Sequence, residues 1–223
     1  MSNIFTPKKE EDYFTPFGPA MGYKKMSTES VKKFNSLLDE NLEDFSNNLV
    51  GKVKQELKFT DEIQNVFLKE FSQYIGKYMS FSEVRNSFGK RNLDSTKYDY
   101  GIQIKQGWFV RQFDTEYNPL HIHSGAALSC VGYLALPKGI DKEWEEDYKD
   151  HHPSHGHIQF AHGSPCKNGS SAFVIKPQVG DFYIFPADLF HCVYPFYTKG
   201  ERRSFSVNLD FLEIIRDKKV DKQ

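Results

Sequence analysis

A change in the spacing of the apolar residues divides the chain and limits the folds open to it. From about Tyr98 onward, short runs rich in β-branched and aromatic residues alternate with Gly, Pro and Asn, and no helical pattern separates them. The runs are YGIQI, GWFVRQF, LSCVGYLALP, HIQFAH, AFVIKP, DFYIFP and RSFSVNLDF. At least seven short strands in one series predict a mainly β protein, an antiparallel sandwich or barrel of the jelly-roll kind.

The N-terminal part of the chain has helical spacing instead. Between Thr28 and about Val50, apolar residues recur at three- and four-residue steps, and Ser27 or Thr28 can cap the start of a helix. A second helix is expected after Thr60, with two acidic residues in its first turn. Its apolar stripe is Ile63, Val66, Phe67, Phe71, Tyr74, Ile75 and Tyr78. We expect both helices to pack on the outer face of one sheet.

These patterns divide the chain into three segments. Residues 1–97 form an N-terminal extension with supporting helices, residues 98–215 the β-rich core, and residues 216–223 a charged tail. One structural domain is expected, because 223 residues with 39% hydrophobic content can bury one core.

A charged insertion from residue 139 to residue 157 interrupts the β-rich core. Histidines crowd this insertion and the strand after it: His151, His152, His155, His157 and His162. A His-rich tract can bind metal, but a surface loop carries titratable side chains without any ligand. We expect solvent exposure for this group, with His157 placed to reach the mouth of a site.

Charge and composition argue against several classes of partner. With 29 basic and 30 acidic residues the net charge is −1, so no long-range field favours nucleic acid or an anionic bilayer. No run approaches the roughly 18 apolar residues of a membrane span. Cys130, Cys166 and Cys192 lack CxxC spacing, which argues against a disulfide framework or a thiolate zinc site. A cytoplasmic protein acting on a small molecule or a peptide is expected.

Two histidines one residue apart, His121 and His123, raise the question of a metal site. Side chains at positions i and i+2 of a strand point to the same face, so the two imidazoles can converge on one ion. The same spacing also suits an ordinary pair of strand histidines. His191, at the start of the strand after DFYIFP, is a candidate third ligand.

A second pair at positions i and i+2 is Arg202 and Ser204. An arginine buried beside a metal would be a costly isolated charge unless a carboxylate paired with it, and the planar guanidinium suits the two oxygens of a carboxylate. The pair therefore predicts a site for an acidic ligand. Strand alternation directs Arg203 away from Arg202, toward the surface.

The sequence resembles the 2-oxoglutarate- and Fe(II)-dependent oxygenases, in particular a small subfamily frequent in marine bacteria and their phages. The shared motifs are N-x-x-H-x-H, the strand LSCVGYLALP where the family has Leu-Ser-Gly-Val-Tyr-Tyr, GHIQF, P-x-x-G-D-F-Y-I-F-P-x-x-x-x-H and E-R-x-S-x-S-x-N. The similarity is close over residues 98–212 and only general over the N-terminal helices.

This resemblance implies a double-stranded β-helix that holds Fe(II) through His121, His123 and His191. Arg202 and Ser204 would bind the far carboxylate of 2-oxoglutarate. The co-substrates of such enzymes are 2-oxoglutarate and O2, the products are succinate and CO2, and the usual result is a hydroxylated substrate. Ser129 and Tyr133 share a strand face, so one of them can also touch 2-oxoglutarate.

One position departs from the superfamily pattern of two histidines and one carboxylate, because His123 stands in the carboxylate's place. A neutral imidazole leaves the ferrous centre one charge more positive, which alters its redox potential and metal preference. Asp114 or Glu116 could supply a carboxylate only if the chain bends back. The alternative is a three-histidine, cupin-type metal-binding protein or dioxygenase that does not use 2-oxoglutarate.

Overall fold

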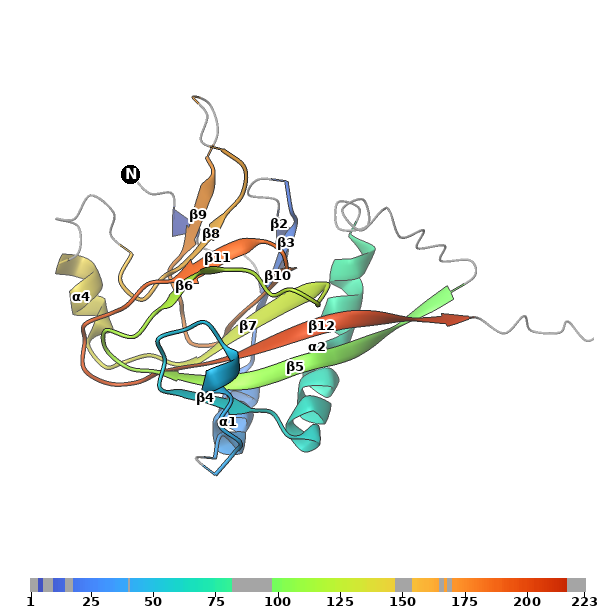
Figure 1. Ribbon diagram of the computed structural model, residues 1–223, viewed down its shortest axis with the longest axis horizontal. Helices are drawn as coiled ribbons and strands as arrows, with labels where there is room; N and C mark the ends of the chain where they lie inside the picture. The colour runs from blue at the N-terminus through green and yellow to red at the C-terminus, as the bar shows by residue number, and fades with distance from the viewer. Residues whose placement is uncertain are drawn as a thin grey trace, which may run out of the picture.

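The computed structural model describes residues 4–5, 10–14, 18–39, 41–81, 98–146, 154–164, 167 and 170–215. These residues form two β-sheets that face each other, with two helices on the outer face of the larger sheet (Figure 1). The smaller sheet has the order β1 (Ile4–Phe5), β9 (Ala172–Ile175), β8 (Ile158–Ala161), β11 (Phe190–Val193) and β6 (Asn118–His121). The larger has the order β2 (Glu11–Phe14), β3 (Met21–Lys25), β10 (Asp181–Pro186), β7 (Leu128–Ala135), β12 (Arg202–Ile215), β5 (Tyr98–Gln112) and β4 (Gln55–Lys58).

From β5 to β12 the chain passes back and forth between the two sheets, except that β8 and β9 follow each other in the smaller one. Strands β5, β7, β10 and β12 are neighbours in the larger sheet, whereas β6, β8, β9 and β11 are neighbours in the smaller one. All pairs within these two groups are antiparallel. This connectivity is that of a double-stranded β-helix, so the jelly-roll fold expected from the sequence is confirmed.

Strand β7 separates two apolar layers, which explains its continuous apolar run. Cys130 and Leu134 pack toward the helices, while Val131 and Tyr133 pack into the space between the two sheets. A strand buried on both faces has no reason to alternate polar with apolar residues.

Helix α2 (Asp61–Ser80) matches the prediction. The Thr60 side chain accepts a hydrogen bond from the Ile63 backbone N–H, and the acidic residues lie in the first turn. The predicted stripe faces the larger sheet, and all of its members except Val66 are fully buried.

Helix α1 (Thr28–Leu37) begins as expected, with the Ser27 side chain accepting from the Ser30 N–H at 3.1 Å. It ends at Leu37, so the prediction that it continues to about Val50 is wrong. Beyond it, the Phe45 N–H donates to the Glu56 carbonyl at 2.6 Å, which ties this segment to β4. Phe45 also packs on the larger sheet, with its ring centre 5.9 Å from that of Trp108. These contacts with the sheet take the place of further helical turns.

The N-terminal part also contributes strands that the helical pattern did not predict. Strand β3 pairs with β10 and β4 pairs with β5, which extends the larger sheet at both edges. The runs YGIQI and GWFVRQF form one strand, β5, and the insertion contains a short helix, α4 (Ile140–Glu146).

Residues 82–97 and 216–223 lie outside the described residues, so the segment boundaries expected at those places stay predictions. Among the residues that the structure describes, no helix has both the length and the hydropathy needed to cross a bilayer.

Candidate metal centre

Three histidines from two neighbouring strands meet at one end of the space between the sheets. His121 ends β6 and pairs directly with His191 of β11, and His123 follows two residues later, just beyond β6. One ring nitrogen from each histidine lies within 4.8 Å of the other two, and the Nε2 atoms of His123 and His191 are 3.2 Å apart. Two imidazoles bonded at about 2.1 Å to one ion and at right angles would have nitrogens about 3 Å apart. The spacing therefore suits a shared metal ion.

Backbone carbonyls fix the orientation of two of these rings. The Nδ1 of His121 lies 2.7 Å from the Pro119 oxygen, and the Nδ1 of His191 lies 2.9 Å from the Leu189 oxygen. A carbonyl accepts only from a protonated Nδ1, so each Nε2 keeps its lone pair for a metal.

Burial keeps all three histidines neutral at neutral pH. It lowers the pKa of His123 to about 4 and lowers the pKa of His121, with carbonyl hydrogen bonds opposing the shift at His121. The pKa of His191 falls well below its usual range, because burial and then the two neighbouring imidazoles disfavour its charged form. The neutral imidazole is the form that ligates metal.

Aromatic side chains enclose the rings. Phe185 and Phe160 pack against His191 with ring centres 5.0 and 5.8 Å away, and Trp108 lies 5.8 Å from His123. The rings are therefore held in place before any ligand arrives.

A pocket of about 500 Å³, its open mouth included, runs from the histidines into the space between the sheets. Its walls include Trp108, Val110, Tyr133, Ile158, Phe185, Arg202 and Ser204. The predicted metal ligands and the predicted acid-binding pair thus line one pocket.

Arg202 is 2% exposed and, among the described residues that line this pocket, is the only Asp, Glu, Lys or Arg. Its Nη1 donates to the Gly156 carbonyl at 2.8 Å and its Nη2 to the Gln112 side-chain oxygen, while its Nε has no hydrogen-bond partner. No carboxylate among the described residues pairs with it. A buried cation without a counter-ion is costly, and a bound anion would offset that cost.

The Tyr133 hydroxyl is a second unused polar group in the pocket. It is buried and has no hydrogen-bond partner, and burial raises the pKa of Tyr133 to about 12, so the hydroxyl stays protonated and can donate. With the Ser204 hydroxyl and the Arg202 guanidinium, it makes a set of donors suited to a ligand carboxylate.

The other residues considered from the sequence lie apart from this pocket. The Ser129 hydroxyl donates to the Asn208 side-chain oxygen at 2.7 Å, and Ser129 is not among the residues that line the pocket. Asp114 forms an ion pair with Lys199, and the Glu116 carboxylate accepts from the Phe113 N–H at 2.9 Å. Neither carboxylate is part of the histidine cluster.

The insertion histidines have mixed environments. His162 is exposed, as expected, whereas His155 is half-buried and lies 3.0 Å from a Glu143 carboxylate oxygen. His157, which was expected near the mouth of a site, is buried. His157 is not among the pocket-lining residues. His151 and His152 lie outside the described residues.

Two residues at this site were not foreseen from the sequence. Gln112 and Gly156 supply the oxygens that accept from Arg202. No motif marked either of them, because Gly156 contributes only its backbone and Gln112 is an ordinary residue at the end of a strand.

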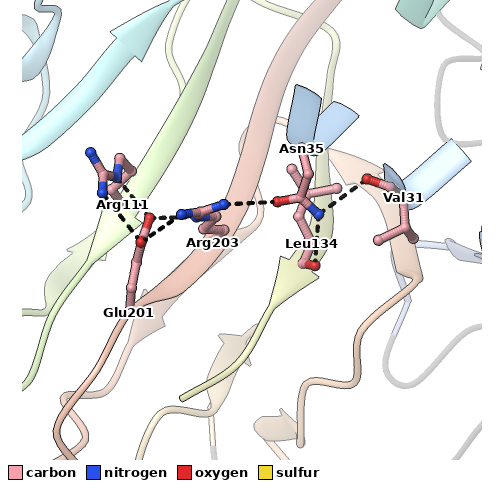
Figure 2. Close-up of polar contacts among 6 residues, drawn as sticks. All are labelled: Val31, Asn35, Arg111, Leu134, Glu201 and Arg203. Carbon is pink, nitrogen blue, oxygen red and sulfur yellow. Dashed lines mark hydrogen bonds and ion pairs between the residues drawn. The ribbon is translucent and has the colours of Figure 1, made fainter. Parts of the chain in front are cut away.

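The strand that carries Arg202 is anchored on its other face (Figure 2). Glu201 accepts from Arg111 of β5 and from Arg203, both at 2.7 Å, and Arg203 also reaches the Asn35 side chain of α1 at 3.4 Å. Arg203 thus points away from the pocket, as strand alternation predicted, while Arg202 points into it.

Comparison with known proteins agrees with this geometry. Residues 106–208 match a family model described as "Putative 2OG-Fe(II) oxygenase". No significant match occurs among curated proteins.

Several solved structures share the fold at low sequence identity. A Pseudomonas putida prolyl-4-hydroxylase is 13% identical with a TM-score of 0.50, and the match covers 85% of this chain and 91% of that one. HygX from Streptomyces hygroscopicus, solved with nickel and 2-oxoglutarate, is 11% identical with a TM-score of 0.50 and coverages of 87% and 83%. The non-heme alpha ketoglutarate dependent carbocyclase SnoK is 9% identical with a TM-score of 0.53 and coverages of 92% and 85%. Over residues 106–208, the chain is therefore similar to the 2-oxoglutarate- and Fe(II)-dependent oxygenases.

Proposed function

We propose that this protein is an oxygenase that binds Fe(II) through His121, His123 and His191 and consumes 2-oxoglutarate and O2. The proposed reaction is hydroxylation of a small molecule or a peptide, with release of succinate and CO2. One observation carries the proposal: three neutral imidazoles converge at a pocket whose buried end holds Arg202 without a carboxylate partner.

The residues present fit the metal. Imidazole nitrogen is a good ligand for ferrous iron, and three protein ligands leave other coordination positions open for a keto acid and O2. His121 and His191 already hold the tautomer that ligation requires. The bound iron would activate O2, which is the oxidant, and the keto acid would supply two of the four electrons that O2 takes up.

The residues present also fit the co-substrate. Arg202 would pair with the far carboxylate of 2-oxoglutarate, and the hydroxyls of Tyr133 and Ser204 would donate to the same group. These contacts would hold the keto acid end toward the histidines. Phe160 and Phe185 would keep water away from the His191 side of the site.

Each of the three proposed segments of the chain would have a different role. Residues 98–215 would form the catalytic core, and residues 1–97 would support it through the helices and edge strands. Residues 216–223 would be a charged tail.

A second candidate function remains because the cluster contains no carboxylate. A cupin-type metal protein that uses no keto acid would also suit three imidazoles. In that case Arg202 would hold another acidic ligand.

Succinate release tests the proposed function. The purified protein, supplied with Fe(II), 2-oxoglutarate and O2, is expected to release succinate slowly even without its own substrate. Iron binding without succinate release, and without binding of 2-oxoglutarate, would instead favour the cupin-type alternative.

A further inference from the structure

A second cavity also reaches His121 and His123. It measures about 750 Å³ with its open mouth, and it shares Trp108, Asn118 and these two histidines with the Arg202 pocket. Its remaining walls come from residues 48–51, Glu56 of β4, Gln106 of β5, residues 122–124 and Asn208. A ligand in this cavity would therefore lie against the same two imidazoles, and Arg202 is not among the residues that line the cavity.

Among the described residues that line this second cavity, Glu56 is the only Asp, Glu, Lys or Arg. It is 1% exposed, and its Oε2 has no hydrogen-bond partner. The side chain of Trp108 donates to the carboxylate, but burial outweighs this bond and, with Asp44 and Glu116 nearby, raises the pKa of Glu56 to about 7. Ionisation of a carboxyl group at this depth is costly without a cationic partner.

A second acceptor in the cavity is also unused. The Asn118 Oδ1 is buried and has no hydrogen-bond partner. A Cβ at Gly51 would lie 1.8 Å from this oxygen, so glycine is what allows the loop to approach it. Val50 and Ile122, 60% and 39% exposed, add apolar surface to the cavity.

We propose that this second cavity binds the substrate to be oxidised, and that the substrate carries a protonated nitrogen on an apolar body. Its N–H groups would donate to the free oxygens of Glu56 and Asn118, and its apolar part would contact Val50 and Ile122. The inference rests on the proposed function only in naming the ligand a substrate.

Arg202 and Glu56 would then direct the two ligands to different places by their opposite charges. Among the described lining residues, the Arg202 pocket has one arginine and no carboxyl group, whereas the Glu56 cavity has one carboxyl group and no arginine or lysine. An anionic keto acid and a cationic substrate would each be repelled from the other's place.

Three probes of equal chain length test this inference: hexylamine, hexan-1-ol and hexanoate. Their binding is measured by calorimetry to the full chain treated with a chelator, so that the amine cannot ligate a metal. Hexylamine is expected to bind at least about tenfold more tightly than either other probe, a difference of about 1.4 kcal/mol. Equal or tighter binding of hexanol or hexanoate, or no saturable binding of hexylamine, would overturn the inference.

Two variants locate the binding. Glu56→Gln keeps the side-chain shape, and is expected to weaken hexylamine binding at least about tenfold. Glu43→Gln removes an exposed carboxylate outside the cavity and is expected to change nothing. Unchanged hexylamine affinity in Glu56→Gln would overturn the assignment.

Nα-acetyl-lysine N-methylamide tests whether the protonated nitrogen of the substrate belongs to a peptide side chain or to a small amine. Tighter binding than hexylamine would assign the nitrogen to a peptide side chain, and weaker binding would assign it to a small amine. These measurements use neither iron nor 2-oxoglutarate. A negative result would therefore count against the amine site without bearing on the proposed oxygenase activity, which succinate release tests.

Discussion

The guanidinium of Arg202 lies 5.7 Å from the centre of the Tyr133 ring, and the Arg202 Nε and the Tyr133 hydroxyl both lack a hydrogen-bond partner. Two buried donors left unused in one pocket are unfavourable for the protein alone. They are explained if a carboxylate binds between them.

Arg202→Ala should weaken 2-oxoglutarate binding on the order of 100-fold, because it removes the only positive charge that lines the pocket. The measurement is calorimetric titration of 2-oxoglutarate into the anaerobic, iron-loaded protein. Arg203→Ala is the matched control: it removes a neighbouring arginine that points to the opposite face, and should leave the affinity unchanged. Equal 2-oxoglutarate affinities in the Arg202→Ala variant and the wild type would argue for the cupin-type alternative.

Tyr133→Phe should weaken 2-oxoglutarate binding without lowering the stability of the fold. Without ligand, the free energy of unfolding should stay the same or rise by up to about 1 kcal/mol, since a buried hydroxyl without a partner is lost. The affinity for 2-oxoglutarate should fall by about five- to tenfold. Urea unfolding and titration measure the two effects. A loss of stability together with an unchanged affinity would show that the hydroxyl serves the fold and not the ligand.

Glu56→Gln should remove a pH dependence of stability. The folded protein raises the pKa of Glu56 to about 7 from 4.5, so it prefers the protonated form. The preference of the folded state for protonated Glu56 costs no stability below the pKa of the unfolded state. Stability falls as the pH rises from that pKa toward the pKa of the folded state. In urea unfolding of the metal-free protein, the variant should exceed the wild type by up to about 3 kcal/mol above pH 7 and match it at low pH. A constant difference between the two proteins at every pH would contradict this.

His191→Ala should abolish stoichiometric iron binding, because it removes the ligand that contacts both other histidines. His162→Ala changes an exposed histidine of the same chain and should retain full iron content. Iron is measured in the dialysed protein by elemental analysis. Full iron content in the His191→Ala variant would remove His191 from the ligand set.

The parts of the fold that could be predicted are those that depend on the spacing of apolar residues within one segment. The stripe of α2 and the short runs from β5 to β12 have regular periods, and positions i and i+2 correctly placed Arg202 and Ser204 on one pocket wall. The His121 and His123 pair also converges, although β6 ends before His123.

The parts that could not be predicted depend on contacts between distant segments. Phe45 continues the helical spacing of α1, but its backbone pairs with Glu56 of β4 instead. Burial of Glu56 itself has no local signal, because QELK reads as an exposed polar run. The carbonyl of Gly156 reaches Arg202 only through the folded insertion, and no residue type encodes a backbone oxygen.

The most direct test of the account is a crystal structure of the protein soaked anaerobically with Fe(II) and 2-oxoglutarate. The account predicts iron bonded to the Nε2 atoms of His121, His123 and His191, with the far carboxylate of 2-oxoglutarate paired to Arg202. Iron held elsewhere, or 2-oxoglutarate bound away from Arg202, would contradict it.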